Sequence, residues 1–521
     1  MSNSSRLNNS IRNAITTGGV YILTMILTMI VRSFLNKTLG PNFVGLNGVL
    51  TSVISSLAIT DLGIDSVFIF LLYKPIYDND IYEVEQLMDM FKKLYLLIGF
   101  TFIFIGMLGN FILRSLIGVE AMRVPHIRLI YFLFVLNTGL SYFFAAYRVI
   151  LNADQKYYII SKVTFLVTII SNAMQIWCLI SFKNFIVYSC IMLISTFTIN
   201  LFLAKVSISI YEKYNLNYSL LPRIKKHQFK NKNTISILIK NTIGGVSNKI
   251  GGIIVYASDN ILLANFENLK IVGMYSNYLL ISQGITSLLS KIVSSVTASV
   301  GNLGAEGNRE KNLKVYLEFS FFINVMVSYI LVTLLIWLSY FIKLWMGKWS
   351  VLPELSVILI ILNCLLQIIR YPSLTFIDAF GLQWIQKWKS IIESLVNISV
   401  SLFLLYKFHL GLVGVLLGTL SSNLLVVNWY EPYIVLKEIC DRKFRRYIFQ
   451  NLVFVLVWGL MFIFLGIFQD KINSTLLCTL LSTVLLYLLL TVFFLCLFYR
   501  STEGRLLFKI LKEKLRSLKR R

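Results

Sequence analysis

The feature that most constrains this chain is the recurrence of apolar stretches of about 20 residues along its length, each long enough to cross a hydrocarbon core of roughly 30 Å as a helix. A helix satisfies its own backbone hydrogen bonds, which lipid requires. The sequence therefore predicts an all-α integral membrane protein with about fourteen transmembrane helices in two pseudo-symmetric bundles around a central cavity. The fourteen stretches are centred near residues 24, 57, 103, 138, 169, 196, 254, 284, 328, 361, 396, 420, 458 and 486.

The low charge content supports this fold class. Charged residues make up 14% of the 521 residues, whereas a soluble domain carries about 25%. An enzyme surrounded by water is therefore excluded, and little chain remains for a folded soluble domain. The cysteines and histidines show no metal-binding spacing, and no GxxxxGK[ST] phosphate loop is present. We therefore predict no metal site, no catalytic residues and no ATP hydrolysis.

The excess of basic residues predicts the topology. Lys and Arg number 49 against 24 Asp and Glu, and most lie in short connections between the apolar stretches. With both termini in the cytoplasm, 36 basic residues fall on the inner side and 10 on the outer side, as the positive-inside rule requires. Topology thus explains the charge of +25, and no nucleic-acid partner is needed.

The longest polar connection divides the chain into two similar lengths. The tail carries leucines at helical spacing among basic residues, which suits either an anionic membrane surface or a solvated end that only fixes topology. We predict an N-terminal bundle of six spans at residues 1–210 and a second bundle of six spans at 241–447, joined by a basic cytoplasmic linker at 211–240. Two further spans follow at 448–499, and a basic cytoplasmic tail at 500–521.

A weak internal repeat relates the two bundles. Aligning Asn13-Ala14-Ile15 with Asn241-Thr242-Ile243 also brings Val44-Gly45 into register with Val272-Gly273. We call this register the repeat alignment. Spans one and seven both cross outward in this topology, so the repeat is parallel, with its axis along the membrane normal. Two such bundles with a substrate site between them are the usual architecture for alternating access.

Ionisable residues inside the spans are the main functional signal, because a charge at the bilayer centre costs at least about 2.5 to 3.5 kcal/mol. Arg32, Lys249 and Lys291 are candidate cavity cations, and Asp61 and Asp259 are intramembrane acids. The glycine-rich start of span seven, at residues 244–252, suits either a cavity wall or close helix packing. The alternative for charges nearer the span ends is snorkelling to the headgroups, which we expect for Asp65, Arg148 and Arg370.

The first hundred residues carry a set of short motifs: Arg32, Leu39-Gly40-Pro41, Gly45-Leu46-Asn47-Gly48, Asp61-Leu62-Gly63-Ile64 and Leu72-Tyr73-Lys74-Pro75, followed by Lys92-Lys93. These motifs resemble those of the polysaccharide and O-antigen flippases, which belong to the multidrug/oligosaccharidyl-lipid/polysaccharide exporter superfamily. The match is specific at the amino end and thin after about residue 100, and Asp61 stands where these proteins often have Glu. The fourteen spans and the break after the sixth agree with that family over essentially the whole chain.

The resemblance implies a bacterial cytoplasmic membrane protein that flips an undecaprenyl-diphosphate-linked oligosaccharide for capsule, exopolysaccharide, O-antigen or teichoic acid synthesis. Its partners would be the polyprenyl-diphosphate-linked glycan, the lipid bilayer and the polysaccharide assembly machinery. Some relatives use a sodium or proton gradient, so Asp259, Asn397 and Asp61 are candidates for ion coupling. No other cofactor is implied.

The chemistry of such a cargo suits the buried cations. A diphosphate and its sugars cannot enter lipid unpaired, because burying an ion costs tens of kcal/mol at a dielectric constant of about 4. A wet cleft in which Arg32, Lys249 and Lys291 meet the diphosphate would remove most of that cost. Two alternatives remain: a multidrug or cation antiporter, which needs a cavity of acids and aromatic residues, and a membrane glycosyltransferase or polymerase, which needs a sizeable outer loop.

Overall fold

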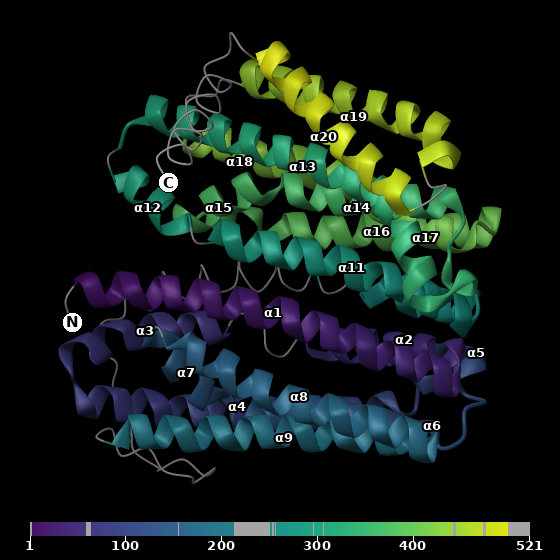
Figure 1. Ribbon diagram of the computed structural model, residues 1–521. Coiled ribbons are helices and arrows are strands. Elements are labelled where there is room, and N and C mark those ends of the chain that lie inside the picture. Colours follow the sequence, from purple (N-terminus) through teal and green to yellow (C-terminus); the bar gives the residue numbers. More distant parts are fainter. Residues whose placement is uncertain are drawn as a thin grey trace. The chain divides into compact units, whose positions relative to one another are not determined.

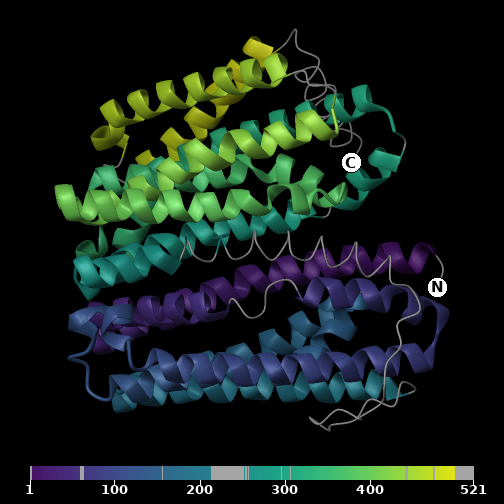
Figure 2. The same ribbon diagram turned by 180° about the vertical axis from the view of Figure 1, so that it is seen from behind.

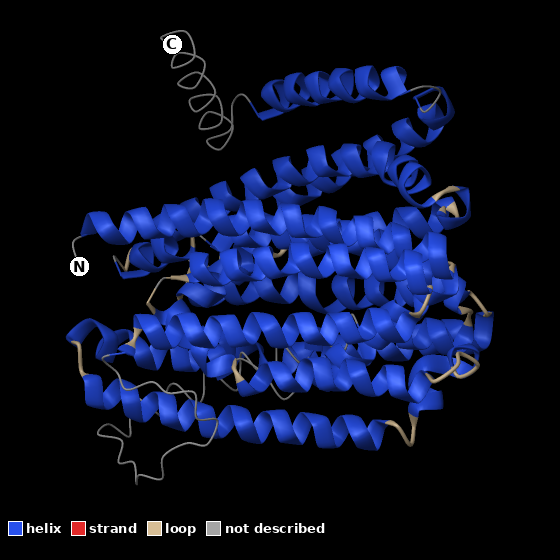
Figure 3. Cartoon of the chain, turned by 60° about the horizontal axis from the view of Figure 1, so that its bottom comes forward, coloured by secondary structure: helices blue, strands red, loops and turns tan. Residues whose placement is uncertain are grey.

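The computed structural model describes residues 3–58, 64–154, 156–212, 251–252, 255, 257–294, 296–305, 307–440, 444–472 and 476–498. Every regular element in these ranges is a helix, as Figure 3 shows. Within the described residues, ten helices are long and apolar enough to span a membrane, or eleven if the bent pair α6 (Ile127–Phe143) and α7 (Ala145–Ala153) counts as one span. The predicted all-α membrane fold is confirmed.

The predicted span centres agree with the helices. Thirteen of the fourteen fall inside a helix, and the centre near residue 254 lies outside the described residues. One candidate span is bent, because α6 and α7 meet at an angle of 49°. Near the second predicted centre, α2 (Pro41–Leu57) and α3 (Ile64–Asp78) stand on either side of residues 59–63, which lie outside the described residues. The total of fourteen spans stays a prediction.

The chain divides into two compact units. The first unit comprises Met1–Ile292 and Leu382–Ser422. Within it, α8 packs against both α1 and α9, and α4 packs against α6 (Figure 1). Besides α2, α3, α6 and α7, its helices are α1 (Asn3–Leu39), α4 (Ile81–Gly109), α5 (Leu113–Ala121), α8 (Tyr157–Phe182), α9 (Phe185–Ile210), α11 (Leu269–Ser294), the 3-10 helix η4 (Gln383–Gln386), α16 (Lys387–Phe408) and α17 (Gly411–Ser422). Residues 257–266 are also helical.

The second unit comprises Val293–Gly381 and Asn423–Arg521. Its long helix α13 packs against α14, α19 and α20, and α12 packs against α15, as can be followed in Figure 2. Its elements are α12 (Thr297–Ala305), α13 (Arg309–Met346), the 3-10 helix η3 (Lys348–Ser350), α14 (Glu354–Ile369), α15 (Tyr371–Ala379), the π-helix η5 (Asn423–Val427), α18 (Asn428–Glu438), α19 (Phe444–Ile472) and α20 (Leu476–Phe498).

These units group helices by contact, so their limits differ from the predicted domain limits, which stay predictions. The predicted tail at 500–521 and most of the linker at 211–240 lie outside the described residues.

The helix ends follow local chemistry. Gly40, at a φ of 92°, separates α1 from α2, whose first residue is Pro41, a position where the missing N–H costs nothing. Asp80 caps α4 by accepting a hydrogen bond from the backbone N–H of Glu83 at 2.9 Å.

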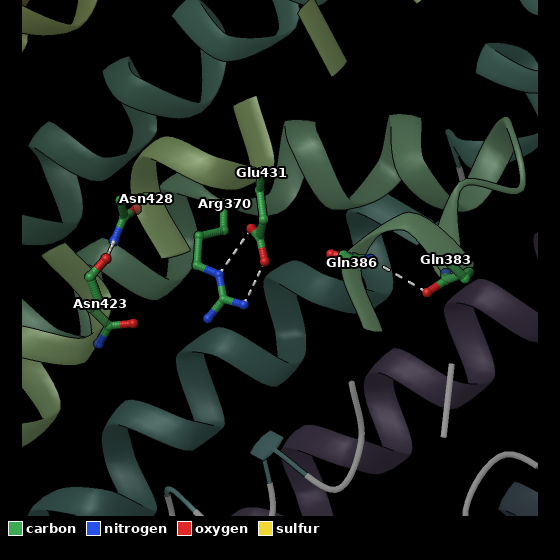
Figure 4. A network of polar contacts seen from close by, with 6 residues as sticks. All are labelled: Arg370, Gln383, Gln386, Asn423, Asn428 and Glu431. Atoms are coloured by element: carbon green, nitrogen blue, oxygen red, sulfur yellow. Dashed lines mark hydrogen bonds and ion pairs between the residues drawn. The ribbon is translucent and has the colours of Figure 1, made fainter. Parts of the chain in front are cut away.

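A buried ion pair joins two helices of the second unit (Figure 4). The Arg370 guanidinium, at the junction of α14 and α15, donates from Nη2 to Glu431 Oε1 at 2.8 Å and from Nε to Oε2 at 3.1 Å. The Glu431 side chain on α18 is fully buried and that of Arg370 is 14% exposed. Our expectation that Arg370 snorkels to the headgroups was wrong, because its guanidinium is held inside the protein by a carboxylate from a helix further along the chain.

Three hydrogen bonds at four-residue spacing join α13 to α20. Tyr329 pairs with Thr491 at 2.8 Å, Thr333 pairs with Tyr487, and Trp337 Nε1 donates to Thr483 Oγ1 at 2.9 Å. The residue numbers of the partners on α20 decrease as those on α13 increase, so the two helices run antiparallel in a fixed register. Such interhelical bonds fix register in lipid, where the hydrophobic effect gives no preference.

We expect the triple change Trp337→Phe, Tyr487→Phe and Thr491→Val to lower the free energy of unfolding by about 2 kcal/mol, because each interhelical hydrogen bond contributes about 0.6 kcal/mol on average and up to about 1.7. Denaturant unfolding in mixed micelles would measure it. Tyr406→Phe is the control, because Tyr406 is 68% exposed. Equal unfolding midpoints for the triple variant and the wild type would contradict a stabilising role for these bonds.

Candidate functional site

The first unit contains a cavity of about 620 Å³ between α1, α2, the 257–266 helix and α11. This volume lies within the range of about 300 to 1,000 Å³ that is typical of small-molecule sites. One lining side chain is charged, and most of the others are hydroxyls or amides. The lining residues are Arg32, Asn47, Gly48, Thr51, Ser52, Ser55, Gly252, Ala257, Asn260, Ser276, Leu279, Leu280 and Gln283.

The sequence repeat meets itself at one end of this cavity. A Cβ atom on Gly45 would clash with the carbonyl oxygen of Leu269, and one on Gly273 would lie 2.8 Å from the carbonyl oxygen of Pro41. The repeat alignment makes Gly45 equivalent to Gly273 and Pro41 equivalent to Leu269. The approach of Gly45 to Leu269 is therefore repeated, with the two repeats exchanged, by the approach of Gly273 to Pro41. Such reciprocal contacts are expected where two repeats meet at a two-fold axis. Only glycine permits so close an approach of the two backbones.

The cavity lining follows the same pseudo-symmetry. Five lining residues from α1 and α2 have equivalents, by the repeat alignment, that line the cavity as well. Equivalent positions of the two repeats therefore line the cavity, whereas their side chains differ. The equivalent pairs are Arg32 with Asn260, Gly48 with Ser276, Thr51 with Leu279, Ser52 with Leu280, and Ser55 with Gln283.

Arg32 is the charged group among the described residues that line the cavity. From α1 its Nε donates to Asn277 Oδ1 at 2.6 Å, and its Nη2 donates to Ser276 Oγ, both on α11. These acceptors are neutral, and none of the carboxylates in the described residues forms an ion pair with Arg32. The guanidinium is thus oriented by hydrogen bonds while its positive charge is left uncompensated, which suits an anionic ligand.

Lys291, the second candidate cation, is not brought to this site. Lys291 is exposed, and its Nζ lies 3.7 Å from the centroid of the Tyr21 ring on α1, in a cation–π contact outside the cavity lining. Lys249 lies outside the described residues, as does Asp61. The roles predicted for Lys249 and Asp61 therefore stay predictions.

Asp259 and Asn397, both selected from the sequence, lie in one buried polar cluster behind the cavity. Asp259 Oδ2 accepts a hydrogen bond from Tyr275 Oη at 3.0 Å, and Thr419 Oγ1 lies 3.3 Å from both carboxylate oxygens. Asn397 Nδ2 donates to Thr419 Oγ1 at 3.0 Å. No ion pair compensates Asp259 within the described residues. The next residue, Asn260, lines the cavity, so the cluster and the cavity share one helix.

Sequence reasoning missed the neutral polar residues of α2. Asn47, Thr51 and Ser55 all line the cavity and are spaced four apart, so they share one helix face. This spacing was visible in the sequence, but a search for buried charges passes over it. Thr419 was missed for the same reason.

Two hydrogen bonds join α5 to the region where α11 begins. The Leu269 backbone N–H at the start of α11 donates to Glu120 Oε2 on α5 at 2.6 Å, and Asn265 Nδ2 donates to the Ser115 carbonyl at 2.9 Å. The carboxylate at the helix N-terminus is also favoured by the helix dipole. In the predicted topology these residues lie on the outer side.

No protein-family model matches the chain, and no curated protein matches it. Several solved structures share its fold. A structure described as the lipid II flippase MurJ in an inward closed conformation has a TM-score of 0.60 and 15% sequence identity, covering 93% of this chain and 100% of that chain. An inward-facing multidrug resistance MATE family transporter of the MOP superfamily has a TM-score of 0.57 and 13% identity, covering 79% of this chain and 95% of that chain.

A third similar structure is a MOP superfamily transporter from Pyrococcus furiosus, with a TM-score of 0.53 and 14% identity, covering 82% of this chain and 96% of that chain. At these identities the likeness establishes the fold. The chain is a multi-pass membrane protein with the MATE-like fold of the MOP superfamily, which the sequence motifs had predicted.

Proposed function

We propose that this protein is a flippase that moves undecaprenyl-diphosphate-linked oligosaccharides across the bacterial cytoplasmic membrane by alternating access, for polysaccharide biosynthesis. The observation that carries the proposal is that Arg32 forms no ion pair with a described residue and lies in a cavity whose other described lining residues are neutral. A planar guanidinium binds phosphate oxygens in pairs, and hydroxyl and amide groups exchange hydrogen bonds with sugars.

The energetics of the cargo support such a cavity. Taking an unpaired diphosphate through hydrocarbon would cost tens of kcal/mol, and each unsatisfied hydroxyl adds several more. A polar cavity at the pseudo-two-fold axis replaces the lost hydration, while the polyprenyl chain can stay in lipid. The similar structure whose description names a lipid-linked cargo, the lipid II flippase MurJ, covers 93% of this chain.

The composition of the cavity argues against the alternatives. A binding site for organic cations gains affinity from acids and aromatic faces, and the described lining contains one arginine and neither an acid nor an aromatic residue. A glycosyltransferase or polymerase would need catalytic groups, and none of the lining residues is an acid or a histidine that could serve as a general base. The similar structures are described as transporters and a flippase.

A binding measurement tests the function directly. Purified protein in detergent should bind undecaprenyl diphosphate and undecaprenyl-diphosphate-N-acetylglucosamine, and neither should be displaced by ethidium, a cationic drug. Native mass spectrometry can count the bound lipids. Tight binding of ethidium with no binding of either diphosphate lipid would favour the antiporter.

The Asp259 cluster is our proposed site of ion coupling. The side-chain oxygens of Asp259 and Thr419 lie together there, and Asn397 Nδ2 donates to Thr419 Oγ1. Hard oxygen ligands with one net negative charge suit Na⁺ or a proton. A bound cation would satisfy the uncompensated carboxylate. Because Asn260 follows Asp259 and lines the cavity, movement of this helix would connect ion binding to the cargo site.

We expect Asp259→Asn to abolish the stimulation of flipping by an imposed Na⁺ or proton gradient, because an amide has no charge to hold either ion. Flipping rates in proteoliposomes with a Na⁺ gradient, a proton gradient or neither would measure this. Glu267→Gln, an acid beyond the end of the same helix, should behave as wild type. Full gradient stimulation in Asp259→Asn would exclude Asp259 as the coupling residue.

A further inference from the structure

The two walls of the cavity are helices related by the repeat alignment, but their side chains differ. Thr51 and Ser52 on α2 are equivalent, by the repeat alignment, to Leu279 and Leu280 on α11, and all four line the cavity. At these two positions the α2 wall is polar and the α11 wall is apolar, although α11 also contributes Ser276 and Gln283 to the lining. A cargo group that lies between these four residues must present unlike faces to the two sides.

The polar wall, formed by Asn47, Thr51 and Ser55, has free hydrogen-bonding capacity. Thr51 Oγ1 donates to the carbonyl of Asn47 at 2.7 Å, so its oxygen lone pairs stay available. Neither the Asn47 side chain nor the Ser55 hydroxyl is hydrogen-bonded to any described residue. Together they offer amide donors, an amide acceptor and hydroxyl groups that can do either. Sugar hydroxyls, which donate and accept at once, need such a mixture.

A second observation comes from the bottom of the same cavity. Asn260 is 5% exposed, and its Nδ2 donates to Ser52 Oγ at 2.8 Å, but its Oδ1 accepts no hydrogen bond within the described structure. An unpaired buried acceptor costs about 1 to 3 kcal/mol, so a ligand donor that reached it would recover that cost. Arg32 occupies the equivalent position in the other repeat, so an anion site and this free acceptor lie across the axis from each other.

We propose that the polar wall is a sugar subsite, which takes the uncharged sugar directly attached to the diphosphate. This inference rests on the proposed function, because it places the diphosphate at Arg32. The ring edge that carries the hydroxyls faces Asn47, Thr51 and Ser55, and the C–H face packs against Leu279 and Leu280. The described lining offers no acid for an amino sugar and no second cation for an acidic one, so the subsite selects neutral sugars.

The test compares two lipids that differ by one sugar. Affinities of the purified full chain for undecaprenyl diphosphate and for undecaprenyl-diphosphate-N-acetylglucosamine are measured by native mass spectrometry titration. Wild type should bind the sugar-bearing lipid about tenfold or more tightly. The triple variant Asn47→Leu, Thr51→Val, Ser55→Ala should bind both lipids equally, with the affinity for undecaprenyl diphosphate unchanged.

Two further variants keep the test decisive if the triple variant folds poorly. Ser55→Ala alone should lower the ratio of affinities about threefold, as expected for one hydrogen bond. Ser56→Ala, on the same helix but outside the cavity lining, should keep the wild-type ratio.

The outcomes separate the two proposals. The sugar subsite would be overturned if the wild type bound the two lipids with equal affinity, or if Ser55→Ala and the triple variant left the ratio of the two affinities unchanged. The flippase proposal would still stand on the binding of undecaprenyl diphosphate. Binding of neither lipid by the wild type would overturn both.

Discussion

Replacing Arg32 by alanine is expected to weaken the binding of undecaprenyl diphosphate about a hundredfold or more. Each hydrogen bond to a charged group contributes about 1.5 to 3 kcal/mol, and a guanidinium can make two to a phosphate. Their loss therefore exceeds the roughly 2.8 kcal/mol that corresponds to a hundredfold change in affinity. The effect should be the same for the lipid with and without its sugar, because the charge is recognised at the diphosphate.

Titration of the purified variants with undecaprenyl diphosphate would measure this. Arg32→Lys should give an intermediate affinity, because an ammonium keeps the charge but not the planar pair of donors. Lys37→Ala is the matched control, since it removes a cation from the same helix, outside the cavity lining. An affinity of Arg32→Ala within threefold of wild type would remove Arg32 from the site.

Replacing Glu431 by alanine is expected to lower the free energy of unfolding by about 3 to 5 kcal/mol. The reason is that the Arg370 guanidinium would remain largely buried without its carboxylate (Figure 4), and breaking a buried ion pair from one side carries a cost of that size. The pair is made by two hydrogen bonds at 2.8 and 3.1 Å, so both charges depend on it. Thermal unfolding in detergent, followed by circular dichroism, would measure the change.

The double variant Arg370→Met, Glu431→Leu separates the cost of an unpaired charge from the net contribution of the pair. It should be more stable than Glu431→Ala, because apolar replacement of a whole buried pair is often neutral or stabilising. If Glu431→Ala unfolds within about 1 kcal/mol of wild type, well below the cost expected for a broken buried pair, the pair does not hold α15 and α18 together.

Much of the fold could be predicted because hydropathy and loop charge act locally. The span centres fall in helices wherever the structure describes them, and the two short matches of the repeat alignment identified Gly45 and Gly273, which meet in the structure. The bend between α6 and α7 was missed. An apolar stretch fixes the length of a span but not where its helix is interrupted.

The site was predicted in part. Arg32 was found because an arginine among apolar residues needs a partner, and Asp259 and Asn397 were found as polar residues in apolar spans. Lys291 satisfied the same criterion, but it lies over Tyr21 instead of in the cavity. Which face of a helix meets the cavity depends on helices far away in the chain, and the sequence around Lys291 does not contain that information. For the same reason the polar face of α2 could be recognised as a cavity wall only once α11 was placed beside it.

The central claim is that this cavity carries a diphosphate-linked sugar from one leaflet to the other. The most direct measurement uses liposomes loaded with undecaprenyl-diphosphate-N-acetylglucosamine and an external galactosyltransferase that cannot cross the membrane. With wild-type protein nearly all of the lipid should be galactosylated. In protein-free liposomes and in those with Arg32→Ala, the enzyme should modify the lipid of the outer leaflet alone. If wild-type protein also left the lipid of the inner leaflet unmodified, the account would be contradicted.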